Sequence, residues 1–251
     1  MKAAQIKQLE RLYRRGVSPE NILSNELARE ISDISSTLNR QIALLINRKG
    51  EISMVILGDA KGIFIPSLEA FRAASTRFKG LRLIHTHLGG EELSAEDLTD
   101  MSHLRLDLVG ALQVKQDGSP GKLFWAHLIP ENPQDDYWLI HEPVEPHRLE
   151  LNFLSFISAL EDEFTRQQKT RKIDAAEKAI LVRVEKNPIS GGQESIEELR
   201  QLAETCGVEV FDTQIQYRPQ PDPKYLVGRG KLSAIDLRAT QIGANLLIFD
   251  H

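Results

Sequence analysis

Tyr217-Arg-Pro-Gln-Pro-Asp-Pro-Lys-Tyr-Leu-Val-Gly-Arg-Gly-Lys231 divides the last third of the sequence into its elements. Three prolines within five residues exclude a helix or a central strand, because proline lacks the backbone donor that both require. The segment Val208 to Ile215 before this stretch predicts a strand. After it, Leu232 to Ile242 has the spacing of an amphipathic helix, and Leu246 to Phe249 predicts another strand.

A further strand and helix are predicted upstream of the proline stretch. Ala179 to Val184 is apolar, as a buried strand would be. Ser195-x-x-Glu198 has the capping-box pattern that begins a helix, and Gly207 is placed to end it. Strand, helix, strand, helix, strand indicates a small parallel sheet with right-handed crossovers. Since His251 directly follows the last strand, where a doubly wound domain rarely stops, we expect residues 175–251 to be a truncated domain.

Composition narrows the class of protein. The 251 residues suffice for one or two domains with cores of their own. No apolar run approaches the roughly 20 residues of a membrane span, and the N-terminus does not resemble a signal peptide. The single cysteine, Cys206, excludes an internal disulfide and fits a reducing compartment. The net charge of −5 gives no overall nucleic-acid signature. We expect a cytoplasmic protein with no membrane partner and, at most, a local basic patch.

The first 146 residues mix helical and strand patterns, which indicates an α/β domain. Ser18-Pro19 is typical of a helix start, with a helical pattern through Ile31. Six apolar runs predict strands: Ile42–Ile46, Ile52–Leu57, Ile63–Ile65, Leu81–His87, Leu108–Val114 and Leu123–Ile129. Residues 147–174 then predict a long connecting helix. The fold class expected for the chain is therefore α/β, with two domains (1–146 and 175–251) joined by a helical linker.

Residues 18–45 leave two readings open. Leu27 to Ile31 followed by Ser35 to Arg40 resembles a DNA-binding helix-turn-helix, although the glycine of its turn is missing. Two amphipathic helices packed on a sheet would give the same pattern.

The last third resembles the N-terminal domain of the HflX family of ribosome-associated GTPases. Ala179-Ile-Leu-Val resembles its first strand, and Glu194 to Thr205 its first helix. Pro221-Asp-Pro-Lys-Tyr-Leu-Val-Gly-Arg-Gly-Lys231 is similar to its signature loop, and Gly243 to Asp250 to the strand that follows. The resemblance implies association with the large ribosomal subunit and its RNA. It also implies a GTPase domain, C-terminal to this region, that binds GTP and magnesium.

This chain lacks the GTPase motifs themselves. A Walker A loop needs Gly-x-x-x-x-Gly-Lys-[Ser/Thr], whose glycines free the backbone to hold phosphates and whose hydroxyl holds magnesium. Around Gly230-Lys231 the first glycine is replaced by Tyr225 and the hydroxyl by Leu232. We therefore expect these 251 residues to supply binding and regulation, with GTP hydrolysis in the further domain.

The signature loop is the candidate RNA contact. Lys224, Arg229 and Lys231 are cations in a glycine-containing loop, a combination suited to phosphate contacts. Tyr225, like Tyr217, could stack on unpaired bases. A solvated turn whose tyrosines pack on the sheet is the alternative.

A candidate metal site lies in the first segment. His85 and His87 alternate on a predicted strand and so point to one face, where both could bind one ion. Asp97, in the first turn of the next helix, would be a third ligand and would leave a fourth position for water, as in catalytic zinc sites. Glu51 could act as general base on that water.

The pattern Glu51, His85-x-His87 and Ser94-x-x-Asp97 resembles the JAMM/MPN metalloprotease core. The resemblance implies a zinc-dependent isopeptidase or related hydrolase. Leu88 stands where that family has proline, and the gap from histidine to serine is one residue short. A JAMM-like domain without full activity is the other reading, in which Ser94-x-x-Asp97 is an ordinary capping box and the histidines are polar residues of a strand.

Overall fold

The computed structural model describes residues 3–68, 78–132, 136–169, 177–185, 192–220 and 226–250. The chain forms two compact units, each considered by itself below. Unit 1 contains residues 1–129 and 138–163, and unit 2 contains residues 130–137 and 164–251. Among the described residues, no helix combines the length and the apolar character needed to cross a bilayer.

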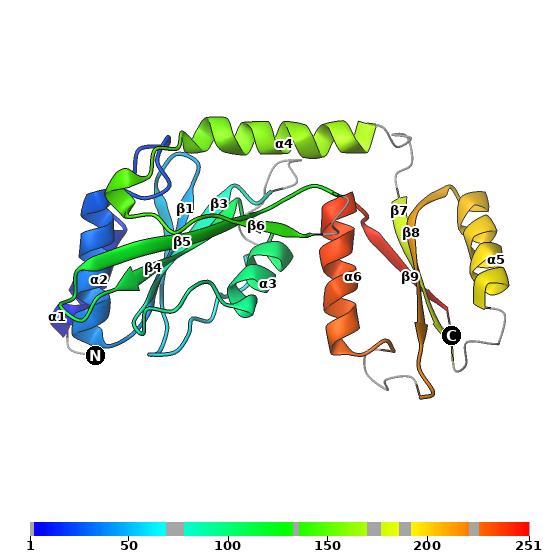
Figure 1. Cartoon of the computed structure of the whole chain (residues 1–251), viewed down its shortest axis with the longest axis horizontal. Coiled ribbons are helices and arrows are strands. Elements are labelled where there is room, and N and C mark those ends of the chain that lie inside the picture. Colours follow the sequence, from blue (N-terminus) through cyan, green and yellow to red (C-terminus); the bar gives the residue numbers. More distant parts are fainter. Residues whose placement is uncertain are drawn as a thin grey trace. The chain divides into compact units, whose positions relative to one another are not determined.

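Unit 1 is built on a six-stranded mixed sheet with the order β2-β1-β3-β4-β5-β6 (Figure 1). Its strands are β1 (Ile42–Asn47), β2 (Ile52–Leu57), β3 (Leu81–His87), β4 (Leu108–Val114), β5 (Pro120–Leu128) and β6 (Trp138–Ile140). Strands β3 and β4 are parallel, and the other neighbours are antiparallel. The predicted strands over β1 to β5 are confirmed to within three residues. The run Ile63–Ile65 is not a strand, and β6 was not predicted.

Helices cover both faces of β3. Side chains alternate along a strand, so Thr86 points away from the face that carries His85 and His87. Thr86 bonds Ser35 of helix α2 (Asn25–Leu38) at 2.7 Å, which places α2 on one face. Asp97 of helix α3 (Ala95–His103) faces the two histidines, which places α3 on the other. Helix α1 (Ala3–Leu12) precedes them.

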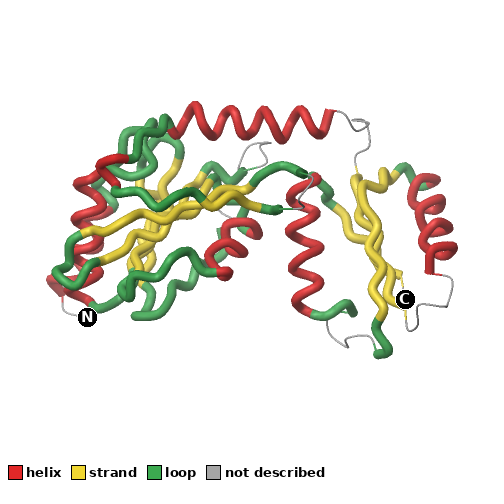
Figure 2. Tube along the Cα trace, in the orientation of Figure 1, coloured by secondary structure: helices red, strands yellow, loops and turns green. Residues whose placement is uncertain are grey.

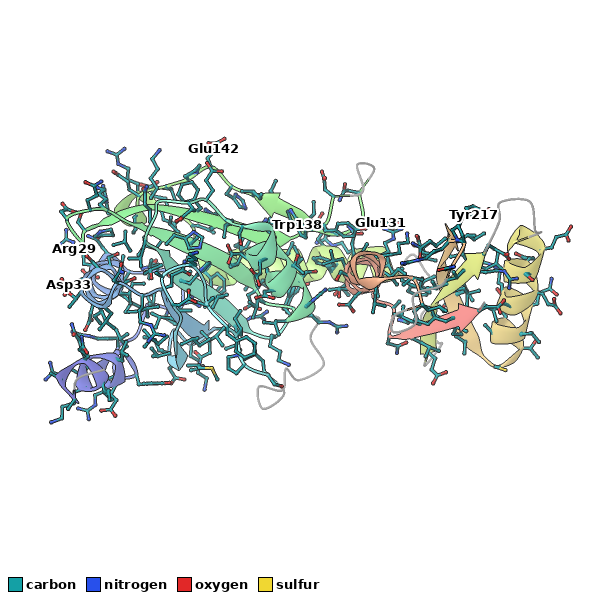
Figure 3. The ribbon with its side chains drawn as sticks, turned by 90° about the horizontal axis from the view of Figure 1, so that it is seen from below. Arg29, Asp33, Glu131, Trp138, Glu142 and Tyr217 are labelled. Atoms are coloured by element: carbon teal, nitrogen blue, oxygen red, sulfur yellow. The ribbon has the colours of Figure 1, made fainter. Side chains whose placement is uncertain are left out.

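Helix α2 begins six residues later than the sequence predicted. Its N-cap is Ser24, whose side chain accepts a hydrogen bond from the backbone NH of Leu27, and the prediction of a start at Ser18-Pro19 is wrong. The helix runs unbroken to Leu38, so the turn of a helix-turn-helix is absent from these described residues. Its apolar side packs on the sheet, while Arg29 and Asp33 lie on its exposed side (Figure 3).

Unit 2 contains a three-stranded parallel sheet with the order β8-β7-β9. Its elements are β7 (Glu177–Glu185), α5 (Gly192–Thr205), β8 (Val208–Tyr217), α6 (Arg229–Ile242) and β9 (Leu246–Asp250), which confirms the predicted strand–helix alternation (Figure 2). Alternate residues of β7 face different helices: Ile180 and Val182 pack in the core that includes α6, and Ala179 and Leu181 in the core that includes α5. The two helices therefore cover opposite faces of this sheet.

For α5 the sequence predicted the end of the helix correctly and its start incorrectly. The helix begins at Gly192, three residues before Ser195, so Ser195 is not its N-cap. Gly207 follows the helix with a φ of 80°, the left-handed conformation expected of a residue that ends a helix.

A buried arginine ties three parts of unit 1 together. The side chain of Arg82 is fully buried, and its guanidinium donates to the carbonyls of Ile22 and Asn47, each at 3.0 Å. It also lies 4.4 Å from the ring centroid of Phe153. Phe153 begins α4 (Phe153–Lys169), which follows the short 3-10 helix η1 (Pro146–Arg148). Helix α4 lies within the predicted linker 147–174, and it begins six residues after the predicted start.

Burial lowers the pKa of Arg82 to about 10, which still leaves the side chain charged at neutral pH. We expect Arg82→Ala to lower the free energy of unfolding by about 3 kcal/mol, because the buried carbonyl of Ile22 and the partly buried carbonyl of Asn47 lose their donor. Urea unfolding measures this, with Arg11→Ala on the exposed side of α1 as a control that should change stability by less than about 0.5 kcal/mol. Equal effects of the two substitutions would contradict the role given to Arg82.

Two further histidines of unit 1, the buried His127 and the half-buried His141, lie beside Trp125. His141 stacks on Trp125, with ring centroids 3.5 Å apart and an interplanar angle of 2°. His127 lies beside them, and its Nδ1 is 2.8 Å from the carbonyl of Leu128. Burial, followed by the neighbouring His127, lowers the pKa of His141 to about 4, and burial also lowers the pKa of His127.

These shifts predict that unit 1 loses stability in weak acid. Both histidines have a lower pKa when folded than when unfolded, where the value is near 6.5. Their contribution is therefore complete above about pH 6.5 and is lost as the pH falls toward about 4. We expect the urea midpoint to be lower at pH 5 than at pH 7.5, and His141→Phe to reduce that difference while keeping the stack on Trp125. An undiminished difference in the variant would assign the pH dependence to other groups.

Candidate functional site

His85, His87 and Asp97 converge in unit 1, as the sequence predicted. The two histidines are the fifth and seventh residues of β3, and their rings lie 4.6 Å apart between centroids. Asp97 comes from the first turn of α3. Its Oδ1 is 3.4 Å from Nε2 of His85, and its Oδ2 is 3.8 Å from Nε2 of His87.

His85 is the least satisfied member of the cluster. Its ring is completely buried, and neither ring nitrogen has a hydrogen-bond partner. Burial lowers its pKa to about 4, with His87 acting in the same direction and Asp97 in the opposite one. The ring is therefore neutral at pH 7. Its Nε2, the nitrogen facing Asp97, has a lone pair for an ion when the ring proton sits on Nδ1.

The other two side chains are held in place by hydrogen bonds outside the cluster. Nδ1 of His87 is 3.0 Å from the carbonyl of Glu91, so a proton on Nδ1 leaves Nε2 free to bind an ion. Oδ2 of Asp97 accepts from the backbone NH of Ser94 at 2.7 Å and from its hydroxyl at 2.8 Å. Ser94 and Asp97 form a capping box. The carboxylate of Asp97 therefore both caps α3 and is a candidate metal ligand.

The three candidate ligand atoms would have to approach one another by up to about 1.5 Å to bind one zinc ion. They lie within 4.8 Å of one another, whereas ligands about 2 Å from a tetrahedral zinc are roughly 3.3 Å apart. Two imidazoles and one carboxylate are donors that zinc accepts, and three protein ligands leave a fourth position open. A bound zinc would act there as a Lewis acid. The unpartnered nitrogens of His85 are the observation that favours an ion.

Glu51 is not part of this site. It pairs with Gly16 in an isolated bridge, and its side chain accepts from the amide of Asn47 at 2.8 Å. Asn47 pairs with Leu81, four residues along β3 from His85, which is roughly 13 Å at strand spacing. The prediction of Glu51 as general base is therefore wrong, since a general base must lie within hydrogen-bond reach of the proton that it takes.

A small cavity of about 140 Å³ opens beside His87 and Asp97. It is lined on one side by Gln41, which sequence reasoning missed because no motif includes it. The rest of its lining is mostly polar and acidic: Lys61, Gly62, Ile63, Glu91, Glu92, Ser94, Glu96 and Asp100.

The structure describes only some of the residues predicted to contact RNA. Lys224 and Tyr225 lie outside the described residues, and Arg229 begins α6 with its side chain outside the description. Lys231 lies in the first turn of α6, where its Nζ bonds Oε1 of Gln214 on β8 at 2.8 Å. Lys231 is thus committed to a contact within unit 2. Tyr217 ends β8 with 49% of its side chain exposed (Figure 3).

We expect one zinc per chain in the purified protein, and its loss in a His85→Ala/His87→Ala variant. The two imidazoles supply most of the affinity, because a single carboxylate holds zinc weakly. Elemental analysis after gel filtration measures the metal content. His103→Ala, at the exposed C-terminal end of α3, should retain the ion. Zinc that persists in the double variant would place the ion elsewhere.

Comparisons with known proteins concern the C-terminal part of the chain. Residues 193–251 match a family described as "GTP-binding GTPase N-terminal". The chain is also 34% identical to the GTPase HflX of Escherichia coli (strain K12) over 80 residues, which are 32% of this chain and 18% of that protein. The chain thus spans less than a fifth of the length of this curated relative. Its C-terminal part is similar to the N-terminal region of an HflX-like GTPase.

Proposed function

We propose that this chain is the N-terminal portion of an HflX-like GTPase that associates with the large ribosomal subunit in the cytoplasm, with a role in translation, ribosome rescue or biogenesis. The observation that carries the proposal is the match of residues 193–251 to the N-terminal region of such GTPases. In this proposal unit 2 binds ribosomal RNA and regulates a C-terminal GTPase domain. GTP and magnesium belong to that domain.

The sequence of the signature loop and the contact of Lys231 do not fit a phosphate-binding loop. Lys231 bonds Gln214, and the loop before it carries neither the first glycine nor the hydroxyl of a phosphate-binding loop. Nucleotide chemistry at Gly230-Lys231 is therefore not proposed. The cations left for RNA are Lys224 and Arg229, with Tyr217 and Tyr225 as stacking residues.

We expect the chain to sediment with purified large ribosomal subunits, and binding to weaken as salt rises, because phosphate contacts release counterions. Lys224→Glu/Arg229→Glu should reduce binding at least roughly tenfold and make it less dependent on salt. Lys231→Glu should have a smaller effect on binding, because the amine of Lys231 already bonds Gln214.

A matched control is Lys115→Glu/Lys122→Glu, which makes the same change in charge at two exposed positions of unit 1. This variant should bind as the unchanged chain does. If the chain does not sediment with large subunits, the ribosome proposal fails. If the two double variants lose binding equally, net charge rather than the loop is responsible.

A second candidate function is a zinc-dependent centre in unit 1. The convergence of His85, His87 and Asp97, with His85 buried and unpartnered, favours it. The JAMM-like pattern of these residues implies an isopeptidase or a related hydrolase. Such a hydrolase needs a general base beside the ion, and Glu51 cannot supply it from its position in the sheet.

A further inference from the structure

Gln41, the residue directly before strand β1, lies beside the candidate zinc centre. Strands β1 and β3 are antiparallel with Ala43 opposite His85, so continuing the register by two residues sets Gln41 opposite His87. Residues directly opposite each other in a sheet place their side chains on the same face, with Cβ atoms about 5 Å apart. Gln41 thus shares the face that carries both histidines.

The environment of Gln41 agrees with this position. Its side chain is 4% exposed and lines the cavity together with His87 and Asp97. Its backbone is held by the residues that follow β2, because its NH donates to the carbonyl of Asp59 at 2.7 Å and its carbonyl accepts from the NH of Gly58 at 2.9 Å. No described residue forms a hydrogen bond with its side-chain amide, which leaves that amide for a ligand in the cavity.

An amide at this position changes what the centre can do. A general base must accept a proton, and the neutral amide of glutamine does not do so near pH 7. It can instead donate a hydrogen bond to an oxygen of a ligand and accept one from a ligand NH. The carboxylate of Glu91 is turned toward its own loop, where it accepts from the backbone NH of Gly89 at 3.0 Å.

We propose that Gln41 is a positioning residue beside the His85/His87/Asp97 centre, so that the zinc-loaded centre binds a carboxylate- or carbonyl-bearing ligand through the ion and the amide of Gln41. The inference rests on the zinc centre proposed above. The ion takes one oxygen of the ligand, and the amide of Gln41 donates to the same group. Gln41 is thus a positioning residue for the ligand.

Two small probes test this assignment on zinc-loaded full chain. Acetohydroxamic acid must give up its hydroxyl proton to chelate zinc as an anion, whereas acetate carries no proton at pH 7. A carboxylate in place of Gln41 would accept that proton and would repel acetate. We expect Gln41→Glu to raise the preference for hydroxamate over acetate at least roughly tenfold, as measured by calorimetry. Gln201→Glu, the same change at an exposed position of α5, should leave the preference unchanged.

A second variant guards against misfolding of Gln41→Glu. Gln41→Met keeps the size of the side chain and removes its hydrogen bonds, so acetate should bind severalfold more weakly while zinc affinity stays the same. Unchanged affinity for acetate in Gln41→Met, or an unchanged preference in a folded Gln41→Glu, would overturn the assignment of Gln41.

The remaining outcomes separate this inference from the zinc centre itself. If the unchanged chain binds no zinc, the centre is absent and the role of Gln41 falls with it. If the chain binds zinc but the zinc-loaded chain does not bind acetate, the centre exists and the role of Gln41 is overturned.

Discussion

The alternation of side chains along β3 is the constraint on which unit 1 depends. Every residue of this central strand is buried, so each side chain must be satisfied by whatever covers its face. Arg82 and Thr86 point to one face, where backbone carbonyls and the hydroxyl of Ser35 receive them. His85 and His87 point to the other. On the first face, most polar side-chain atoms have hydrogen-bond partners within the protein. On the second face, the ring nitrogens of His85 have none in the described part of the chain and are available to a metal ion.

The sequence predicted the elements better than their ends. Strands β2, β3 and β4 are found at the predicted residues. Their runs of apolar residues are too short for a buried helix and are bounded by turn residues, so the sequence alone indicates a strand. Helix starts were missed where two capping signals compete: Ser24 caps α2 although Ser18-Pro19 has the stronger local pattern. The short strand β6 was missed because its pairing with β5, and not its own sequence, makes it a strand.

The convergence of His85, His87 and Asp97 was predictable from the sequence, and its surroundings were not. His85-x-His87 and Asp97 follow from the period of a strand and the first turn of a helix, which are local rules. Which residue stands across from His87 depends on the register of β1 against β3, a long-range pairing that no local pattern fixes. Glu51 was predicted as the general base because, with His85-x-His87 and Ser94-x-x-Asp97, it completed the JAMM/MPN-like pattern. The register excludes Glu51 and brings Gln41 to the cavity instead.

The carboxylate of Asp97 has two roles that cannot be separated. One of its oxygens caps α3 through Ser94, while the other faces His85. Helix ends open more readily than central strands, since fewer contacts hold them. An ion in this centre would therefore leave through the fraying of one helical turn, with β3 and its histidines undisturbed. The exchange rate of the metal would then report on the first turn of α3.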